Sequence, residues 1–289
     1  MPEIAFLLGD VAEARNDNHL RLPEAFRASG WRVTALPHDA VRMRHGQVCL
    51  GDLDPQRFQL IWLVGFGPAE SFLDRMQLLR HVDQRRFVNA IDPLIHLHAK
   101  TAWAKRLPET YVSNDLEYLV SILDRGGNWI AKPTAGSFGR DVSRVNAGPA
   151  GRAVVAGLIG ATGRYCLLQR FVPAVAEGEK RTLMAGGRVI GSYLRRPGSD
   201  FRTNLATGAD AEPTRLSAEE RQLVQAVTDE LGTAGVGFAA IDTVYPYLME
   251  VNLANPGGLS TLASVYGEDF GPRVADAVAG SRGVPRGSQ

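Results

Sequence analysis

Apolar and polar residues alternate along the chain in short blocks that predict strands and helices in turn. Residues 3–9 (EIAFLLG) and 31–36 are apolar runs of strand length, and a helix ending near residue 28 is expected between them. Gly30 then stops the helix. This strand–helix–strand order predicts a parallel sheet with ligand sites beyond the carboxyl ends of its strands. The polar loop 16–19 lies at such an end, so it is either a substrate contact or ordinary turn chemistry.

The pattern continues with a hairpin over 41–50, a strand over 61–64, a helix over about 69–82 and a short strand over 87–89. We therefore expect residues 1–91 to form a first α/β lobe. The GFGPAE segment after the third strand is too short and proline-interrupted for a phosphate loop, and no GxGxxG follows the first strand. A dinucleotide-binding Rossmann site is thus not indicated.

The middle of the chain predicts a helix over 92–107 that carries Lys100, and a second helix near 116–123. His96 and His98 are two residues apart, so they face different sides of a helix and are interpreted as structural. The segment WIAKPTAGSFG then predicts a strand ending in Lys132 and a glycine loop, followed by a strand over 143–145. This combination is typical of a flexible lid, because glycines let backbone N–H groups surround phosphate oxygens.

Strands are next predicted over 165–172, 182–184 and 189–194, with a polar turn over 177–181. The irregular segment 195–213 is rich in Gly, Pro and Asp yet carries three arginines, which suits the anchoring of a carboxylate or phosphate; a solvated basic loop is the alternative. Ser217 and Glu220 mark a capped helix start, and this helix runs to about residue 231. A last helix is expected over about 260–279, and 281–289 is expected to be a flexible tail.

The most informative stretch is GFAAIDTVYPYLMEVNLANPGG, which reads as two apolar strands around a turn at Tyr245-Pro246. It places Asp242, Glu250 and Asn252 within a hydrophobic run, where oxygen-bearing side chains need a partner. Mg²⁺ fits, because it binds one or two carboxylates together with substrate phosphates. A two-residue loop would set Asp242 opposite Met249, whereas a loop of odd length sets it opposite Glu250. We predict the odd loop; an edge hairpin with solvated acids is the alternative.

The composition of the chain argues against nucleic-acid binding, membrane association and export. The chain of 289 residues is 45% hydrophobic and has a net charge of +1, so no global field draws it to nucleic acid or an anionic membrane. Its apolar runs are far short of a membrane span, and no export signal opens the chain. Its two cysteines, Cys49 and Cys166, lack CxxC spacing and fit a reducing compartment. We expect a cytoplasmic protein that acts on small molecules, with no nucleic-acid or membrane partner.

Lysine is rare among the 32 basic residues of the chain. A chain that otherwise uses arginine and keeps a lysine does so where a compact ammonium group works better than a planar guanidinium, as at a buried phosphate contact. Chance explains any single lysine about as well, and Lys105 is assigned to chance. The four lysines are Lys100, Lys105, Lys132 and Lys180.

These features occur in a recognisable order. A lysine on the linking helix is followed by a strand lysine with its glycine loop, an apolar strand into EGEKR, an Arg/Asn loop and a D-x₇-E-x-N hairpin. The order resembles that of the ATP-grasp ligases, most closely the bacterial glutathione synthetases. The segments YCLLQRFVPAVAEGEKR, DFRTNLATGA and IDTVYPYLMEVN carry the resemblance, which covers roughly residues 90–280.

The resemblance implies an α/β fold with α+β lobes. It consists of an N-terminal parallel-sheet lobe (1–91), a linking helix with a small central lid lobe (92–163) and a C-terminal antiparallel-sheet lobe (164–280). It also implies an ATP-dependent carboxylate–amine ligase that works through an acyl phosphate, using ATP and two Mg²⁺ ions, with Mn²⁺ as an alternative. Similar enzymes form homo-oligomers. A dry, closed site without a protein nucleophile suits phosphoryl transfer.

The resemblance further implies a role for each candidate residue. The transferring phosphate and the acyl substrate would be met by Arg181, Arg195, Arg202 and Asn204. The ATP phosphates would contact Lys100, Lys132 and the loop of Gly136, Ser137 and Gly139. The adenine would be bordered by Gln169, Arg170, Phe171 and Val172, and the ribose held by Glu179. The metal ions would be carried by Asp242, Glu250 and Asn252.

Some segments depart from the family pattern. Phe138 interrupts the lid loop, which leans towards the ribosomal-protein glutamate ligases of the same superfamily. WLVGFGPAE replaces an acidic DPPFD-like segment, and LANPGGLSTL follows Asn252 in place of a Ser/Thr-rich tail. Three functions therefore stay open: synthesis of glutathione from γ-glutamylcysteine and glycine, ligation of an amino acid to another small peptide or carboxylate, and a non-catalytic ATP-binding homologue.

Overall fold

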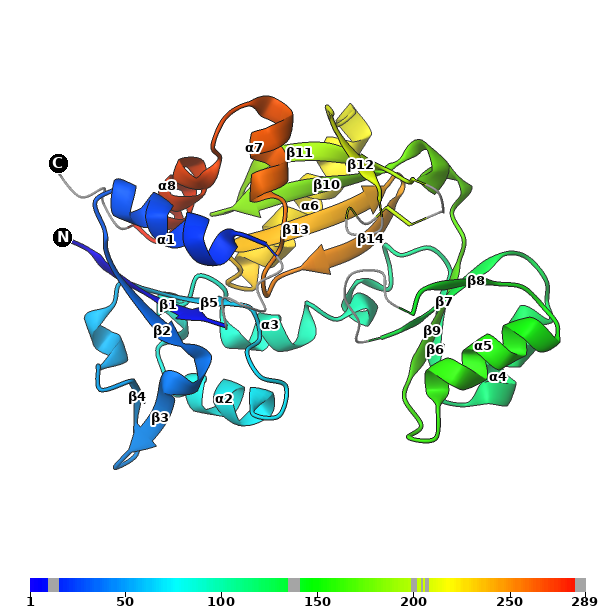
Figure 1. Ribbon diagram of the computed structural model, residues 1–289, viewed down its shortest axis with the longest axis horizontal. Helices are drawn as coiled ribbons and strands as arrows, with labels where there is room; N and C mark the ends of the chain where they lie inside the picture. The colour runs from blue at the N-terminus through cyan, green and yellow to red at the C-terminus, as the bar shows by residue number, and fades with distance from the viewer. Residues whose placement is uncertain (10–15, 135–140, 199–201, 204, 206–207, 284–289) are drawn as a thin grey trace.

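The computed structural model describes most of the chain, in which two large sheets lie beside each other and a smaller lobe is set to one side of them (Figure 1). The described residues are 1–9, 16–134, 141–198, 202–203, 205 and 208–283. Besides the helices and strands given below, short 3₁₀ turns occur at His38–Ala40, Pro55–Arg57, Gln84–Arg86 and Pro173–Glu177. No helix in the described part of the chain is long and apolar enough to cross a membrane.

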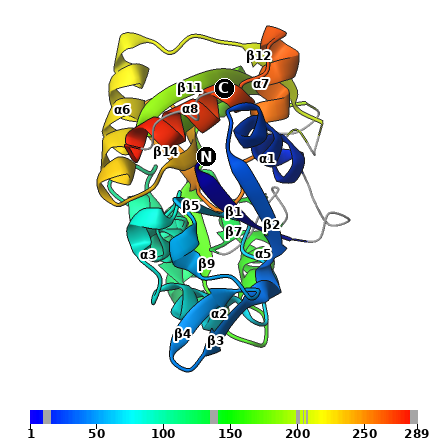
Figure 2. The same ribbon diagram turned by 90° about the vertical axis from the view of Figure 1, so that its left-hand side faces the viewer.

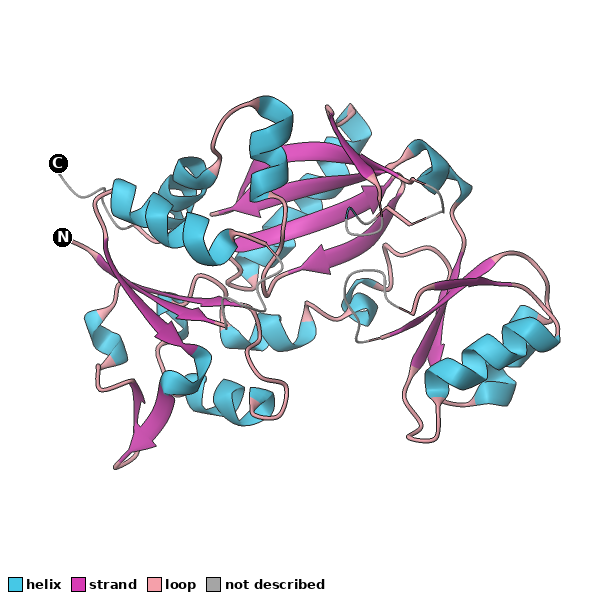
Figure 3. Ribbon diagram, viewed as in Figure 1, coloured by secondary structure: helices cyan, strands magenta, loops and turns pink. Residues whose placement is uncertain are grey.

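The first layer is a three-stranded parallel sheet in the order β2-β1-β5 (Figure 3). It contains β1 (Glu3–Leu8), β2 (Arg32–Pro37) and β5 (Leu60–Val64), and α1 (Asn18–Ala28) connects the first two strands. The predicted strand–helix–strand unit and its parallel pairing are therefore confirmed. The predicted hairpin is present as β3 (Val41–Arg44) and β4 (Gln47–Leu50), and α2 (Phe72–Leu79) is shorter than predicted.

The predicted strand over 87–89 is wrong, because this segment makes only single bridges. Phe87 pairs with Ile61, and Asn89 pairs with Val236. The Asn89 side chain explains the irregularity. Its Nδ2 donates to the carbonyls of Phe238 (2.8 Å) and Leu253 (2.9 Å), and its Oδ1 accepts from the N–H groups of Gly237 and Phe238. A buried side chain thus takes over the hydrogen bonding that a regular strand would supply.

The predicted continuous helix over 92–107 is also wrong. The structure has α3 (Ile91–His96) and then a separate 3₁₀ turn over Lys100–Trp103. Ala99 is in an extended conformation between them. The indole of Trp103 donates to the carbonyl of Leu97 at 2.9 Å, so it satisfies a backbone group at the end of α3 that a continuing helix would have used.

The central lobe is a four-stranded antiparallel sheet with two helices on one face (Figure 1). The sheet order is β6-β9-β7-β8. Its strands are β6 (Thr110–Ser113), β7 (Trp129–Pro133), β8 (Ser143–Val145) and β9 (Cys166–Arg170), and its helices are α4 (Leu116–Leu123) and α5 (Pro149–Ile159). The predicted strand pair around the glycine loop is confirmed by the antiparallel pairing of β7 with β8.

The third layer is a five-stranded antiparallel sheet in the order β12-β11-β10-β13-β14. It contains β10 (Glu179–Ala185), β11 (Arg188–Arg196), β12 (Asp210–Pro213), β13 (Phe238–Val244) and β14 (Tyr247–Asn252). Strands β10 and β11 extend beyond their predicted limits, and β12 lies in the segment predicted to be irregular. The helix α6 (Ala218–Thr233) begins with the predicted capping box of Ser217 and Glu220.

The predicted last helix is in fact two helices, α7 (Leu259–Tyr266) and α8 (Gly271–Ser281). Gly267 ends α7 in the left-handed region at φ 72°, which favours glycine and stops a helix. The parallel sheet lies beside the five-stranded sheet in both views (Figures 1 and 2). Side chains of both sheets share their cores: Trp62 packs edge-on against Phe238 at a ring-centre distance of 5.3 Å. The central lobe has its own core around Trp129 and Leu168.

Candidate active site

The hairpin of β13 and β14 pairs Asp242 with Glu250, as predicted, but a β-bulge and not an odd loop length produces this register. The loop has two residues, Tyr245 and Pro246, joined by a cis peptide bond, so the predicted odd loop length is wrong. Thr243 pairs with Leu248 and Asp242 pairs with Glu250, which leaves Met249 as the extra residue of a β-bulge. The bulge shifts the register by one and brings the two carboxylates opposite each other.

Asp242 is almost fully buried and is held by two arginines. Arg181 on the neighbouring strand donates from Nε to Oδ1 (2.7 Å) and from NH2 to Oδ2 (2.6 Å), and Arg195 lies 3.0 Å from Oδ2. Burial alone would raise the pKa of Asp242, but the two guanidinium groups outweigh it and hold the pKa below its usual value. Asp242 is therefore a buried carboxylate whose charge is compensated within the protein.

Glu179 forms a second pair one strand further along the sheet. Arg195 donates to its Oε2 at 2.8 Å, and the Thr203 hydroxyl donates to the same oxygen. Burial raises the pKa of Glu179, and Arg195 opposes this only in part. Its predicted role at the ribose stays a prediction. Sequence reasoning missed the pairing, although the β10–β11 register, in which Glu179 lies opposite Arg195, produces it directly.

Glu250 and Lys100 close the opposite end of the cluster. The Lys100 ammonium lies 2.8 Å from Glu250 Oε1, and the Asn252 amide donates to Glu250 Oε2 at 3.4 Å. Burial alone would raise the pKa of Glu250, but Lys100 lowers it. The structure thus brings all three predicted metal ligands to one edge of the sheet, with an ammonium group beside them.

Lys132 approaches from the central lobe. Its Nζ donates to Gln169 Oε1 at 3.0 Å, and Gln169 in turn donates to the Thr110 hydroxyl at 2.9 Å. Burial lowers the pKa of Lys132 to about 8, and the charge of Lys100 adds to this effect. Glu250 and Glu179 also act on Lys132 electrostatically. The two lobes therefore direct ammonium groups towards the same cluster of carboxylates.

The segment predicted to border the adenine follows from Gln169. Because neighbouring strand residues face opposite sides, Arg170 points away from Lys132. Its guanidinium packs on Trp129 at 3.9 Å from the ring centre and pairs with Glu109, so its side chain is occupied within the central lobe. Phe171 packs under the guanidinium of Arg144, and Val172 is nearly buried. Their contact with a nucleotide stays a prediction.

Several predicted residues lie outside the described part of the chain: Gly136, Ser137, Gly139 and Asn204. The same holds for residues 10–15 and for part of the predicted arginine loop. Arg202 is described, and its neighbour Thr203 reaches Glu179. The arginine loop therefore meets the carboxylate cluster at Thr203.

The loop after Asn252 is fastened to the first lobe by asparagines. Asn18 is almost fully buried and donates from Nδ2 to Asn255 Oδ1 (2.8 Å) and to the carbonyl of Pro256 (3.0 Å). Asn16 donates to the carbonyl of Asn255, and Arg181 donates to the carbonyl of Gly257 at 3.2 Å. The sequence predicts the polar loop 16–19 at a strand end, but it does not predict that this loop contacts Asn255 and Pro256. His98 also joins the site region, since its Nδ1 accepts from the Leu253 N–H.

The donor set of the hairpin is compatible with a hard divalent cation. Asp242 and Glu250 are opposed carboxylates and Asn252 adds an amide oxygen, which is the ligand chemistry of Mg²⁺. Within the described residues, no group of three or more His, Cys, Asp or Glu side chains gathers to hold an ion by itself. Such a site depends on oxygens from a substrate phosphate to complete it, and this is how Mg²⁺ binds beside a nucleotide.

Comparison with known proteins agrees with this geometry. The family described as prokaryotic glutathione synthetase, ATP-grasp domain, matches residues 97–267. The glutathione synthetase of Parasynechococcus marenigrum is 33% identical over 76% of this chain and 74% of its own length. That of Prochlorococcus marinus subsp. pastoris is 28% identical over 86% of this chain and 82% of its own length.

Solved structures support the fold. The crystal structure of the D-cycloserine synthetase DcsG superposes with a TM-score of 0.70 and 20% identity, covering 97% of this chain and 99% of that one. The crystal structure of the RimK domain protein ATP-grasp from Sphaerobacter thermophilus superposes with a TM-score of 0.69 and 21% identity, covering 95% of this chain and 98% of that one. The parallel first sheet, the central lobe and the five-stranded sheet are therefore arranged as in an ATP-grasp fold. Because the family match spans more than half of the 289 residues, the chain belongs to the prokaryotic glutathione synthetase family of ATP-dependent ATP-grasp ligases.

Proposed function

We propose that the protein joins γ-glutamylcysteine to glycine, with ATP converted to ADP and phosphate. The observation that carries the proposal is the row of charged side chains across the five-stranded sheet, in which Arg195, Glu179, Arg181 and Asp242 alternate in sign and Glu250 lies opposite Asp242. Lys100 and Lys132 flank this row. Fixed cations and oxygen ligands without a protein nucleophile suit phosphoryl transfer, which depends on positioning and charge neutralisation.

The reaction has two steps. A carboxylate oxygen of the acyl substrate attacks the γ-phosphorus of ATP, and the bond to the β-phosphate oxygen breaks to release ADP. The amine of the second substrate then attacks the carbonyl carbon of the acyl phosphate, loses a proton and expels phosphate. We assign the ATP phosphates to Lys100 and Lys132, and the transferring phosphoryl and acyl groups to Arg181, Arg195, Arg202 and Asn204.

We assign the divalent ions, Mg²⁺ in two positions, with Mn²⁺ as the alternative, to Asp242, Glu250 and Asn252. When bound, they supply positive charge at the terminal phosphates. Asp242 holds arginines and Glu250 holds Lys100 in the ligand-free arrangement. Ions held there would take carboxylate oxygens that now pair with the guanidinium and ammonium groups, and these groups would then be available to phosphate and carboxylate oxygens.

A second candidate joins an amino acid to a different small carboxylate. It is favoured by the segment LANPGGLSTL after Asn252, because this segment departs from the family pattern. Asn255 in this segment accepts hydrogen bonds from Asn16 and Asn18 of the first lobe. DcsG also matches the chain over almost its full length while bearing the name of a D-cycloserine synthetase. The ATP-handling residues are the same in both candidates, and only the acyl and amine substrates differ.

The experiment that separates these candidates is a phosphate-release screen across acyl donors and amines with the full-length protein. We expect release that requires both γ-glutamylcysteine and glycine. Release with other pairs, and none with this one, would contradict glutathione synthesis and favour the second candidate. The absence of release with every pair would favour a non-catalytic ATP-binding protein.

Glu250→Gln provides the internal check on the site. It removes the charge that pairs with Lys100 and should abolish turnover while ATP still binds. Glu24→Gln, an exposed change on α1, should leave turnover unchanged. Substrate-dependent release that survives Glu250→Gln would contradict the metal assignment. We further expect the enzyme to act on small molecules in the cytoplasm as a homo-oligomer, without nucleic-acid or membrane partners.

A further inference from the structure

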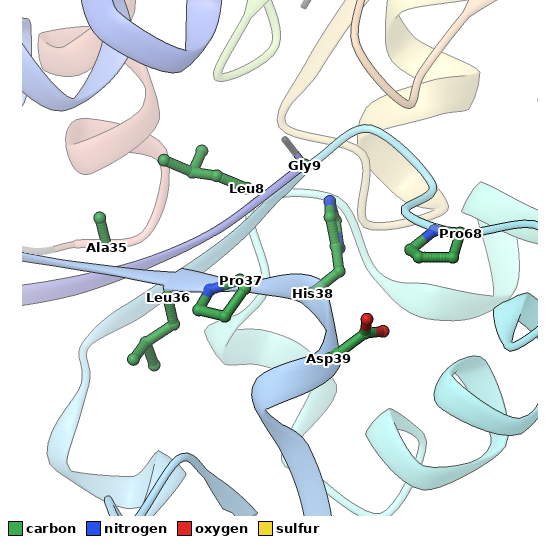
Figure 4. Close-up of a pocket in the computed structure, with 8 residues that line it drawn as sticks. All are labelled: Leu8, Gly9, Ala35, Leu36, Pro37, His38, Asp39 and Pro68. Carbon is green, nitrogen blue, oxygen red and sulfur yellow. The ribbon is translucent and has the colours of Figure 1, made fainter. Parts of the chain in front are cut away.

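Buried polar side chains have different partners in the first lobe and in the central lobe. A pocket of about 510 Å³ opens at the carboxyl ends of the parallel strands of the first lobe (Figure 4). Its polar side chains are bonded within that lobe, since the His38 ring bonds the carbonyl of Val64 and Asp39 pairs with Arg75. In the central lobe, a series of hydrogen bonds ends at Lys132, which is directed towards the carboxylate cluster of the five-stranded sheet. This second arrangement therefore bears on the proposed site for ATP.

The hydrogen bonds of the central lobe can run in one direction only. An ammonium group only donates, so Lys132 Nζ donates to Gln169 Oε1 at 3.0 Å and fixes the orientation of this amide. Gln169 Nε2 must then donate, and its acceptor is the Thr110 hydroxyl at 2.9 Å. The hydroxyl gives its single hydrogen to the carbonyl of Pro108 at 2.6 Å. Thr110 thus accepts from Gln169 with a hydroxyl whose own hydrogen is already bonded.

These side chains share the face of the central sheet that α4 and α5 leave uncovered. Thr110 lies opposite Gln169 in the pairing of β6 with β9, and Gln169 lies opposite Ile130, two residues before Lys132. Residues that are opposite on paired strands, or two apart on one strand, face the same side of a sheet. The alternate residues, such as Trp129, form the core beneath the two helices. The strand register therefore sets the series of bonds on the face directed away from the helices.

The orientation of Gln169 depends on Thr110. The amide is almost fully buried, and a buried N–H group that loses its acceptor is costly. Without the hydroxyl, Gln169 Nε2 would lose its acceptor, and turning the amide over would set its NH₂ group against the Lys132 ammonium. Either change weakens the bond between Gln169 and Lys132. This is the one hydrogen bond that the described residues give to Lys132, so two of its three N–H groups remain for a ligand.

The far end of the series is anchored close to the hairpin that carries the carboxylates. Pro108 lies in the segment that leads into β6. Two residues earlier in this segment, the carbonyl of Arg106 accepts from the Leu248 N–H of β14 at 3.0 Å, and Leu248 precedes Glu250 by two residues. The backbone that holds the Thr110 hydroxyl is thereby attached to the strand of the proposed metal ligands.

We propose that Thr110 is a positioning residue of the ligase: its hydroxyl sets the orientation of the Gln169 amide, and the amide holds the Lys132 ammonium group in place for the ATP phosphates. The inference rests on the proposed function, which assigns Lys132 to those phosphates. Thr110 acts through Gln169 and Lys132 and contacts neither ATP nor substrate itself.

The charge of Lys132 is the quantity that this arrangement controls. Burial, and to a smaller extent the charge of Lys100, lower the pKa of Lys132 to about 8, while Glu250 and Glu179 oppose them. The Gln169 acceptor favours the ammonium form, because a hydrogen bond to a charged group is worth roughly a factor of ten or more. Loss of that acceptor should therefore lower the pKa of Lys132 further, so that the ammonium form is lost at a lower pH.

The test measures the titration of Lys132 in the full-length protein without ATP. Protein labelled with ¹³C in its lysines gives signals from four side chains, and Lys132→Met identifies the signal of Lys132 by its loss. We expect a wild-type midpoint near pH of about 8. Thr110→Val keeps the branched shape but loses the hydroxyl, and it should lower the midpoint by about one pH unit. Thr110→Ser keeps the hydroxyl and should keep the wild-type midpoint.

Thr34→Val is the matched control, because Thr34 is a partly buried strand threonine like Thr110 but lies on β2 of the first lobe. It should leave the Lys132 midpoint unchanged. Gln169→Leu removes the amide itself and should lower the midpoint as Thr110→Val does, so the test does not depend on the folding of one variant. An unchanged midpoint in Thr110→Val or in Gln169→Leu overturns the proposal, and so does a lowered midpoint in Thr110→Ser.

ATP binding by the same variants, measured with Mg²⁺ at pH 6 and pH 9, distinguishes positioning from a general loosening of the site. We expect Thr110→Val to bind ATP about tenfold more weakly than wild type at pH 9. At pH 6 the two proteins should bind ATP almost equally, because Lys132 is an ammonium group in both. A merely structural role would weaken binding equally at both pH values, and this result would overturn the proposal.

The two measurements keep this proposal apart from the proposed function. A lowered Lys132 midpoint in Thr110→Val, together with ATP affinities that all variants share, would support the series of hydrogen bonds and contradict the assignment of Lys132 to the phosphates. A loss of ATP affinity at high pH with the same midpoint in wild type and Thr110→Val would support that assignment and overturn the role of Thr110.

Discussion

Individual charges at the site are set by burial and by one or two close partners. Lys132 on β7 of the central lobe has Gln169 as its hydrogen-bond partner, and burial lowers its pKa to about 8. Arg181 and Asp242 show the opposite balance, because their mutual contact outweighs burial and favours the charged form of both. At this scale the site consists of paired charges beside one lysine that is easily deprotonated.

If Lys132 contacts the ATP phosphates, as proposed, the affinity for ATP depends on pH. Bound phosphates would favour the ammonium form and raise its pKa above about 8, so binding would take up a proton above that pH. Affinity should be nearly constant below that pH and should fall above it by up to about tenfold per pH unit. Titrations between pH 7 and 9.5 measure this. Lys132→Met should bind ATP more weakly and lose the slope, and exposed Lys105→Met should keep both.

The residue types in the D-x₇-E-x-N hairpin were enough to predict that Asp242 and Glu250 face each other. They were not enough to predict the loop length or the bulge that produces this pairing. The pairing of Asp242 with Glu250 is confirmed, whereas the loop length is wrong because Met249 forms a bulge. A bulge follows from packing on both faces of the strand, and no short sequence pattern marks it. The arginine partners of Asp242 could not be predicted from the hairpin, since they come from neighbouring strands.

At the scale of elements, the strands were predicted better than the joints between them. Apolar periodicity located β1, β5, β9 and β13, because each buries a continuous run of side chains. The breaks after α3 and α7 depend on contacts or conformations that periodicity does not report, such as the bond from Trp103 to the Leu97 carbonyl. Asn89 is the clearest case, since an asparagine in a predicted strand gives no sign that its side chain bonds the start of β13 and the residue after β14.

Asn89 should be a main determinant of stability. It hydrogen-bonds four backbone groups of Gly237, Phe238 and Leu253, of which only the Gly237 N–H has a second partner among the described residues, the carbonyl of Val88. Leaving a buried group unpaired costs roughly 1–3 kcal/mol. Asn89→Ala should therefore lower the free energy of unfolding by at least about 3 kcal/mol. Urea denaturation measures this, with exposed Asn114→Ala as the control. A loss no larger than that of the control would show that water replaces the side chain.

For the whole molecule, two hydrophobic cores are shared between the two large sheets, and a third core lies within the central lobe alone. The parallel sheet and the five-stranded sheet contribute side chains to the same two clusters, whereas the central lobe has a cluster of its own. This division follows from the sheets being packed against each other in one case and connected through the chain in the other (Figure 1). The sequence predicted three sheet-bearing segments, but shared cores depend on long-range packing that periodicity does not encode.

The shared cores predict two units of local unfolding. Amides of β7 and β9 should become exposed to exchange together, with a protection level of their own. Amides of β1 and β13 should share a second, higher level, because Phe6 and Ala240 belong to one cluster. Native-state hydrogen exchange at increasing denaturant measures both levels. A single level for all four strands would contradict the division.

The pairing of Asp242 with Arg181 and Arg195 limits which ligands can gain from binding. Every group that leaves its present partner has to find another, because an unpaired charge in such surroundings is costly. Under the proposed function, a nucleotide that arrives without the acid to be activated would offer too few replacements, and the arginines would gain little by turning to it. Hydrolysis of ATP in the absence of the acid would then be disfavoured, and selectivity would come from the completeness of the set of ligands rather than from the strength of any one contact.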